Sequence, residues 1–475
     1  MKEKFIALTH RWTLNQKGLV TNVVVLCIIL GAAFWRATVY GDLGLSVAHT
    51  DTHAYITSSE VNLLSWKAFT TNLPFTTNLT YQVFKPEGGY QLGRVSNINT
   101  GTISRRDRPG FDDIATFQSL LSILAWSSLA WIFSSKLKSS TVKIIAAGVI
   151  VLFGFTPQVA DWDSVLGTES LSISLFVLAF ALFIELAFQS VHHTKPTPIT
   201  IIFFLLFFAS IFLWTFVRDV NPYAMVFLQF FLWGLFAFPK FRWKPFILIA
   251  GSLVSLLFIV GVLSVRQRPP VGRNLSIIWE IDLMPFPARA QFFTDRGMPE
   301  QDSPEFQDWF KNHADTTYML FLLAHPGYTI ANYFEDLNYA FLENMQPYFI
   351  VRDNPYREAL IIMGNYLHPV SPGVFLLVCI LFIPLVAGTF TKNQPDAGLW
   401  LWLTTWPFLT ASATLFLSIF GVPLGLHRHG LSSTVTFRIL LWCLLFVMID
   451  FTIRMKGEQQ DSLDPANASD SPLMK

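Results

Sequence analysis

Carboxylates stand in short polar segments between long apolar runs of the sequence. Asp51 follows the first apolar run, and Glu169 opens the fourth. Between them, Asp161 and Asp163 flank Trp162 in the short segment after the third run. A carboxylate in such a segment can act as a general base toward a hydroxyl or an amine. Carboxylate oxygens can also hold a divalent cation.

Cationic side chains occur in two further polar segments of the same kind. Arg218 and Asp219 separate the fifth run from the sixth, and Arg428 and His429 precede the last run. Arginine suits a phosphate, which it often binds through two charge-assisted hydrogen bonds. Because ionisable residues are costly in a membrane, their location is informative. Acids and bases at one depth predict a polar cavity that holds a lipid phosphate.

Each of these residues also has a structural interpretation. The alternatives are a helix cap for Asp51, a solvated loop for Asp161 and Asp163, a favourable helix dipole for Glu169, a mutual ion pair for Arg218 and Asp219, and headgroup contacts for Arg428 and His429. Asp112 and Asp113, just before the second run, are interpreted as helix caps.

The composition identifies the class of protein. Of 475 residues, 52% are hydrophobic and only 14% are charged, whereas soluble domains carry roughly 25% charged residues. The net charge of +1 leaves no basic surface for nucleic acid. All three cysteines lie inside apolar runs, so neither a disulfide nor a zinc site is expected. These values exclude a soluble enzyme and predict a multi-pass membrane protein.

The elements that must position the polar segments are membrane-spanning helices. A helical span needs about 20 mostly apolar residues, and about ten such runs occur. They lie near 19–38, 115–134, 142–160, 168–188, 198–217, 221–238, 245–265, 372–391, 398–420 and 433–453. Lysine and arginine in the short connections favour both termini in the cytoplasm and a plasma-membrane location.

This orientation assigns two long segments to the outer face, 39–114 and about 266–371. Amphipathic patterns predict that the second forms a helical layer on the membrane surface. The expected fold is therefore an all-α polytopic bundle with an extracytoplasmic helical layer. The expected divisions are an N-terminal transmembrane module over 1–265, the helical loop region over 266–371, the last membrane helices over 372–454 and a disordered cytoplasmic tail over 455–475.

The layout resembles the GT-C glycosyltransferases, polytopic enzymes that use polyprenyl-phosphate sugars. An early acid in a long outer loop, in the segment 51–55, carries part of the resemblance. That loop leads through a surface helix into 117–121, and the acid-bearing loop 161–171 is similar to the second outer loop of the family. The resemblance implies an inverting hexosyl or pentosyl transfer in the cell envelope, to a glycan, lipid or protein acceptor, with lipid phosphate as the leaving group.

The resemblance also implies roles for single residues. Asp51 would be the catalytic base, and Asp161, Asp163 or Glu169 would hold the donor phosphate or a divalent cation such as Mg or Mn. Asp163 and Glu169 are the expected metal ligands. The remaining implied roles are lipid-phosphate binding by Arg218, Arg428 and His429, and support by Tyr55 and Asp219. Many family members carry two adjacent acids in the first loop, whereas Thr52 follows Asp51, so the metal requirement stays open.

Two other classes of function stay open on the sequence alone. A transporter or flippase for a lipid-linked saccharide would use helices broken near the midplane, and Pro157, Pro384 and Pro407 interrupt apolar runs. A non-catalytic assembly subunit would bind a partner through the aromatic-rich region 279–349. Release of free polyprenyl phosphate separates the enzyme from a transporter.

Overall fold

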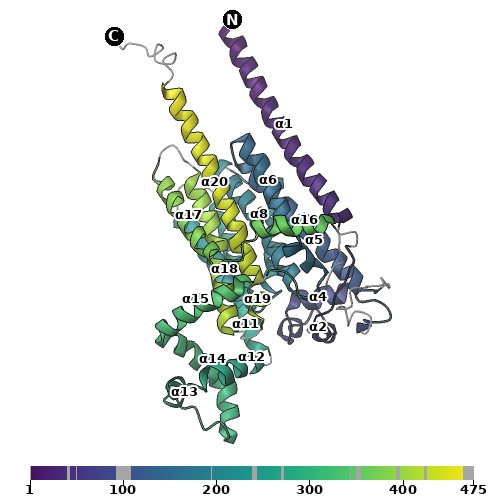
Figure 1. The fold of residues 1–475 in the computed structure, drawn as a ribbon, viewed down its shortest axis with the longest axis vertical. Helices are drawn as coiled ribbons and strands as arrows, with labels where there is room; N and C mark the ends of the chain where they lie inside the picture. The colour runs from purple at the N-terminus through teal and green to yellow at the C-terminus, as the bar shows by residue number, and fades with distance from the viewer. Residues whose placement is uncertain are drawn as a thin grey trace.

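The computed structural model describes residues 2–39, 43–49, 51–92, 108–193, 195–237, 243–268, 272–342, 344–348, 355–391, 396–421 and 425–463. Helices make up nearly all of the regular structure in these ranges (Figure 1). Their β pairing is one isolated parallel bridge between Val47 and Val165. The all-α fold expected from the sequence is confirmed.

Seven helices in the described ranges are long and apolar enough to cross a membrane. They are α1 (Lys2–Val39), α5 (Phe111–Lys136), α8 (Glu169–His192), α9 (Pro198–Thr215), α11 (Lys244–Gln267), α18 (Ala397–Gly421) and α20 (Leu431–Leu463). An eighth span forms if α6 (Ser140–Phe155) is joined to α7 (Pro157–Ala160) and the 3-10 turn η2 (Asp161–Ser164), across a bend of 46°. The chain is a multi-pass membrane protein.

The remaining two of the ten apolar runs are also helical but shorter. One is α10 (Asn221–Gly234), which continues as the 3-10 turn η3 (Leu235–Ala237), and the other is α17 (Gly373–Thr389) with 17 residues. Both pack against α18 in the bundle. Helix α20 continues to Leu463, into the predicted disordered tail, and residues 464–475 lie outside the described ranges.

Helix α8 forms the centre of the bundle. Its most apolar stretch is 83% buried inside the protein, whereas that of α1 is 17% buried. Helices α5 and α9 pack along α8, and α18 and α20 also contact it. A helix that is apolar on every face is typical of a buried position. The first residue of α8, Glu169, is therefore held in place by the whole bundle.

Short helices gather at the end of the bundle away from both termini (Figure 1). Helices α2 (Thr52–Ser58), α3 (Lys67–Thr70) and α4 (Phe75–Val83) come from the first loop. The second loop and the last turn supply α12 (Gly272–Ile278), the π-helical turn η4 (Trp279–Leu283), α13 (Pro287–Thr294), α14 (Pro304–Ala324), α15 (Pro326–Leu342) and α19 (Leu426–His429). Helix α16 (Pro355–Leu367), also from the second loop, lies beside the lower end of α1 in Figure 1 and contacts α6 and α7. The region 320–371 contains no candidate span among its described residues.

Several acids have local structural partners. Asp113 accepts a hydrogen bond from the backbone N–H of Gly110 at 3.1 Å, which caps α5 as expected. Near the other end of the bundle, Glu185 pairs with Lys136 at 2.5 Å. Asp450 accepts the backbone N–H groups of Lys138 and Ser139 at 3.0 and 2.7 Å. These carboxylates hold helices in place.

Candidate functional site

Two polar loops are joined side by side before α2 and α8. The backbone N–H of Val47 donates to Ser164 at 2.8 Å, and that of Leu166 donates back to Val47 at 2.8 Å. The hydroxyl of Tyr81 also donates to the carbonyl of Leu166, at 3.0 Å. This bridge places the chain that leads to Asp51 next to the chain that leads to Glu169.

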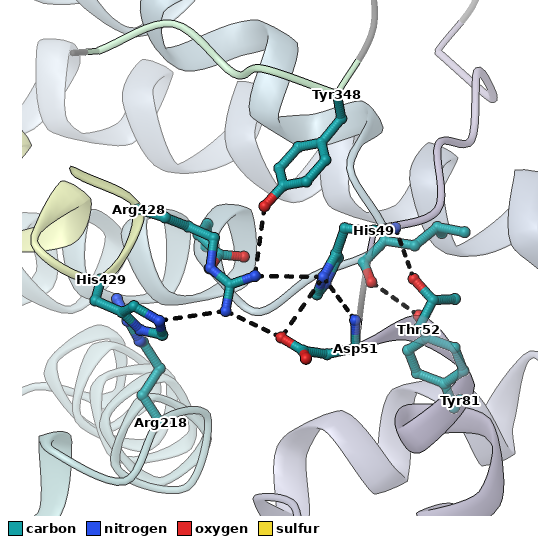
Figure 2. Close-up of polar contacts among 10 residues, drawn as sticks. His49, Asp51, Thr52, Tyr81, Arg218, Tyr348, Arg428 and His429 are labelled. Atoms are coloured by element: carbon teal, nitrogen blue, oxygen red, sulfur yellow. Dashed lines mark hydrogen bonds and ion pairs between the residues drawn. The ribbon is translucent and has the colours of Figure 1, made fainter. Parts of the chain in front are cut away.

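Asp51 precedes the first residue of α2 but does not cap it, because its side chain makes no capping hydrogen bond. The hydroxyl of Thr52, rather than Asp51, makes the local hydrogen bond to the backbone: it accepts from the N–H of His49 at 2.9 Å. The carboxylate of Asp51 extends to Arg428, whose Nη2 lies 2.9 Å from Oδ2 (Figure 2). The helix-cap alternative for Asp51 is therefore wrong.

Arg428 is the centre of the site. It lies on α19, which begins after Gly425 in a left-handed conformation with φ of 69° that glycine adopts without strain. Its Nε lies 3.4 Å from Oε1 of Glu169, so one guanidinium bridges two carboxylates. The Arg428 side chain also lies 3.4 Å from the hydroxyl of Tyr348 (Figure 2).

His429 lies between two arginines. Its Nδ1 is 3.2 Å from Nη2 of Arg218, and its Nε2 is 3.3 Å from Nη2 of Arg428. Burial and the two guanidinium charges lower the pKa of His429 to about 2, so the ring is neutral. A neutral imidazole accepts at only one nitrogen. One of the two arginines therefore points at an N–H group and keeps a free donor.

Arg218 has neutral partners. It lies in the turn between α9 and α10, is 9% exposed, and donates to the hydroxyl of Ser432 at 3.4 Å besides contacting His429. Across the part of the chain that the structure describes, no carboxylate lies within 4.0 Å of Arg218 in an ion pair. Burial lowers the pKa of Arg218, because a charged group loses hydration there. Asp219 pairs with Arg268 rather than with its neighbour, so the mutual ion pair is wrong.

We call Asp51, Glu169, Arg218, Arg428 and His429 the Arg428 cluster. The structure thus brings together five of the residues selected from the sequence. It joins side chains from the first loop, the start of α8, the α9–α10 turn and α19.

Two unpaired polar atoms lie at one edge of the Arg428 cluster. Oε2 of Glu169 and Nε2 of His49 are buried without a hydrogen-bond partner. Since Nδ1 of His49 accepts from the N–H of Asp51 at 3.1 Å, its proton resides on Nε2 when the ring is neutral. Burial lowers the pKa of His49 and favours that neutral form. A side chain at Gly167 would meet both atoms, so the absence of one keeps this edge open.

Aromatic side chains form the walls of the site. Tyr55, predicted as a supporting residue, is buried and packs edge-on against the ring of His49 at 5.3 Å. Tyr348 also packs against His49, at 5.7 Å, and against Trp162 at 6.2 Å. Burial and the nearby carboxylates raise the pKa of Tyr55, so its hydroxyl stays protonated.

Asp161 and Asp163 lie outside the Arg428 cluster. Asp163 pairs with Arg36 at 3.2 Å and accepts from the hydroxyl of Ser170 at 2.6 Å. Asp161 pairs with Arg357 at 2.5 Å. Both acids are buried, which excludes the solvated-loop alternative. These pairs tie the bend after α6 to α1 and to α16.

The residues do not fit a resident divalent cation. Asp163, one of the two expected ligands, is engaged by Arg36. Between Asp51 and Glu169 the guanidinium of Arg428 lies where a cation would neutralise two carboxylates. No three His, Cys, Asp or Glu side chains of the described ranges are grouped so that they could hold a metal ion. Arg428 supplies the positive charge at this place.

Sequence reasoning missed several residues of the site. His49 and Tyr348, which contact Arg428, are absent from the sequence predictions, as are Arg36 and Arg357, which pair with Asp163 and Asp161 outside the Arg428 cluster. His49 lies two residues before Asp51, so proximity to the candidate base was a usable signal. The other three are brought near by packing between distant segments, 80 positions apart for Tyr348 and Arg428, 127 for Arg36 and Asp163, and 196 for Arg357 and Asp161.

Comparison with solved structures finds a similarity to the archaeal oligosaccharyltransferase AglB from Archaeoglobus fulgidus, solved in complex with an inhibitory peptide and a dolichol-phosphate. The TM-score is 0.44 at 11% sequence identity, over 93% of this chain and 52% of that chain. The chain therefore spans about half the length of this protein. No protein-family model matches the chain, and no curated protein matches it significantly. Because the similarity is distant, the function proposed below depends on the side chains of the Arg428 cluster.

Proposed function

We propose that the chain is a membrane glycosyltransferase that takes a sugar from a polyprenyl-phosphate carrier at the extracytoplasmic face. The observation that carries the proposal is Arg218, a buried arginine whose described partners are neutral. Glu169 attracts the charge of Arg218 but makes no ion pair with it. A buried charge whose hydrogen-bond partners are all neutral is costly. A phosphate that accepts from Arg218, and from the arginine N–H that faces the protonated nitrogen of His429, would remove that cost.

An apolar pocket begins next to Arg218 and suits the tail of such a donor. Ser432, which accepts from Arg218, lines this pocket together with Ile173, Trp214 and Asn221. The pocket is narrow and lies among α5, α8, α9, α10, α18 and α20. A charged head at the mouth and an apolar interior match an isoprenoid phosphate.

In this proposal Asp51 would act as the general base. Its side chain is 42% exposed, so an acceptor can reach it, while Arg428 fixes one of its oxygens. The carboxylate would take the proton from an acceptor hydroxyl or amine as that atom forms a bond to the anomeric carbon. The bond from that carbon to the phosphate oxygen breaks, and polyprenyl phosphate leaves with the electron pair. Attack opposite the leaving group inverts the anomeric configuration.

Arg428 and Arg218 would stabilise the charge that develops on the leaving phosphate. Preorganised cations in a site with little water are worth more than they are in solution. Glu169, with 3% of its side chain exposed, orients Arg428 through the contact at Nε. Nη2 of Arg428 contacts Asp51, and a phosphate would accept from Nη1 in place of the long contact with Tyr348. The cell-membrane location and the cytoplasmic termini belong to the same proposal.

The test uses purified protein in lipid, a labelled polyprenyl-phosphate sugar, and release of free polyprenyl phosphate as the readout. Asp51→Asn is expected to lower transfer at least a hundredfold, since the loss of a general base typically costs that much. Asp219→Asn is the matched control, because Asp219 is 44% exposed and also pairs with an arginine but lies outside the Arg428 cluster. Unchanged release in Asp51→Asn would remove Asp51 from the mechanism.

A second pair of variants tests the phosphate site. Arg218→Gln is expected to raise the donor KM about tenfold to a hundredfold, from the loss of a charged hydrogen bond. Arg268→Gln removes another buried arginine, one that pairs with Asp219 outside the Arg428 cluster, and controls for damage to the fold. A wild-type protein that moves the donor across a membrane without releasing polyprenyl phosphate would be a transporter, and the enzyme proposal would fail.

A further inference from the structure

A buried arginine in the last membrane helix lies outside the Arg428 cluster. Arg438 of α20 is 0% exposed, and its described hydrogen-bond partners are neutral. Its Nη2 donates to the carbonyl of Phe341 at 2.9 Å, and its Nε donates to the carbonyl of Pro369 at 3.0 Å. The third contact, from Nη1 to the hydroxyl of Thr434, is 3.3 Å long. Because the side chain is fully enclosed, its charge serves the chain itself rather than a ligand.

The two carbonyl groups lie at the ends of two outer helices. Phe341 is in the last turn of α15, and Pro369 follows the end of α16 by two residues. The last four carbonyl groups of a helix have no partner within that helix, and the helix dipole favours a cation near them. The ring of Phe341 also lies 5.1 Å from the guanidinium carbon of Arg438. One side chain therefore holds the end of α15 to the end of α16.

The connection between these two helices brings Tyr348 to the Arg428 cluster. Asn344 fastens the start of this connection, because its side chain donates to the carbonyl of His368 at 3.3 Å. The backbone carbonyl of Asn344 accepts from Nε1 of Trp162 at 3.2 Å. Trp162 in turn packs on the ring of Tyr348, whose hydroxyl contacts the cluster at 3.4 Å. A continuous path of contacts thus leads from the buried arginine of α20 to the site.

The hydroxyl of Tyr348 has a proton to offer. Its oxygen accepts from Nη1 of Arg428, and none of the described residues accepts its proton in a hydrogen bond. Burial raises the pKa of Tyr348, so the hydroxyl stays protonated. A phenolic hydroxyl can donate as well as accept. A phosphate that takes Nη1 of Arg428 from Tyr348 therefore meets an O–H donor beside the guanidinium.

We propose that Arg438 is a positioning residue that places Tyr348 so that its hydroxyl donates to the phosphate of the sugar donor. This inference rests on the proposed function, which supplies the phosphate. Arg438 itself touches neither substrate. It joins the ends of α15 and α16, so the connection between them starts and finishes at fixed points. Without the guanidinium the two helix ends are free to separate, and Tyr348 is held less closely at Arg428.

The first test compares Tyr348→Phe, Arg438→Met and the double variant in the assay of polyprenyl-phosphate release. Tyr348→Phe is expected to raise the donor KM about threefold to tenfold, from the loss of one hydrogen bond. The kcat should stay near that of the wild type, because this hydrogen bond is present both before and during the transfer. Arg438→Met should raise the same KM by no more than Tyr348→Phe does. The KM of the double variant should equal that of Tyr348→Phe, since the arginine then has no hydroxyl left to place.

The second test measures the position of the connection without any substrate. Hydrogen–deuterium exchange of the full-length protein in lipid is followed by mass spectrometry on peptides that cover residues 341–348. Arg438→Met is expected to speed this exchange at least about threefold, since the local structure opens more often, whereas Tyr348→Phe should leave it unchanged. Arg438→Lys keeps the charge and can reach one carbonyl at a time, so its exchange should lie between those of the wild type and Arg438→Met. It also replaces the methionine variant if that protein does not fold.

Trp442→Phe is the matched control. Trp442 lies one turn further along α20 and donates to the carbonyl of Leu367 at 2.9 Å, so it holds the end of α16 but not that of α15. Its loss should change neither the donor KM nor the exchange of residues 341–348. Equal effects of Trp442→Phe and Arg438→Met would overturn the inference. So would KM effects of Arg438→Met and Tyr348→Phe that multiply in the double variant.

The outcome is separable from that of the proposed function. If sugar transfer depends on Asp51 but Tyr348→Phe leaves the donor KM unchanged, the function stands and this inference is wrong. If the exchange of residues 341–348 responds to Arg438 as expected but the wild type releases no polyprenyl phosphate from any sugar donor, Arg438 does hold the connection and the transferase is wrong.

Discussion

The ion pair between Arg428 and Glu169 provides a quantitative test of the site. Only 3% of the Glu169 side chain and 16% of the Arg428 side chain are exposed. Removing one partner of a buried pair leaves the other charge unpaired and typically costs about 3–5 kcal/mol. Asp51 is 42% exposed, so its share of the contact adds at most about 1 kcal/mol. Arg428→Met is therefore expected to lower the free energy of unfolding by about 3–5 kcal/mol.

The double variant distinguishes a paired charge from simple loss of packing. In Arg428→Met with Glu169→Gln neither charge remains, so the loss should be smaller than the sum of the single losses. We expect a coupling energy of about 2–3 kcal/mol, the upper part of the range for residues in contact. Asp51→Asn should cost about 1 kcal/mol or less.

The measurement is reversible denaturant unfolding in mixed micelles, followed by tryptophan fluorescence. The four proteins of the cycle are compared at one pH and one salt concentration, since both affect ion pairs. Single losses that add within about 0.5 kcal/mol in the double variant would show that Arg428 and Glu169 act independently. The bridge between the two carboxylates would then be refuted.

Three further outcomes are expected. Gly167→Ala places a methyl group against Glu169 and His49, so the rate of sugar transfer should fall. The control is Gly148→Ala, where the added atom meets no neighbour and the rate should equal that of the wild type. Chelation of divalent cations with EDTA should leave transfer unchanged, because Arg428 stands between the two carboxylates; inhibition reversed by added Mg²⁺ would contradict this. The folded-state pKa of His429, about 2, lies below its ordinary value of 6.5, so the unfolded chain binds more protons between these values. This group therefore leaves the free energy of unfolding unchanged above pH 6.5 and lowers it by about 1.4 kcal/mol per pH unit below that value. In His429→Gln the free energy of unfolding, measured from unfolding curves at several pH values, should fall less steeply as the pH is lowered. The same dependence on pH in both proteins would count against a buried neutral ring.

The membrane fold could be predicted because its signal is local. Each apolar run indicates by itself that its residues avoid water, and all ten runs are helical in the structure. The lengths of α10 and α17 could not be predicted as well, because an apolar run does not indicate where its helix ends or whether that helix crosses the bilayer. Polar turns and the first residues of helices could also be located, because their signal lies in a few neighbouring residues.

The site was only partly predictable because its partners are distant in sequence. Asp51 and Arg428 were both selected, yet nothing in either segment indicates that they meet across 377 positions. Asp161 and Asp163 carry the same local signal as Glu169, but the fold gives them arginines of their own. Spacing identified residues able to do chemistry, and packing decided which of them share one site.

The contact between Asp51 and Arg428 also has a consequence for biogenesis. The two residues are 377 positions apart, so a ribosome must have translated the whole of the intervening chain before they can meet. A nascent fragment that stops before α19 carries Asp51, Glu169 and Arg218 without their shared guanidinium. The enzyme proposed here would therefore become competent only after α19 has been made, and chains inserted as far as α18 would not consume the carrier lipid.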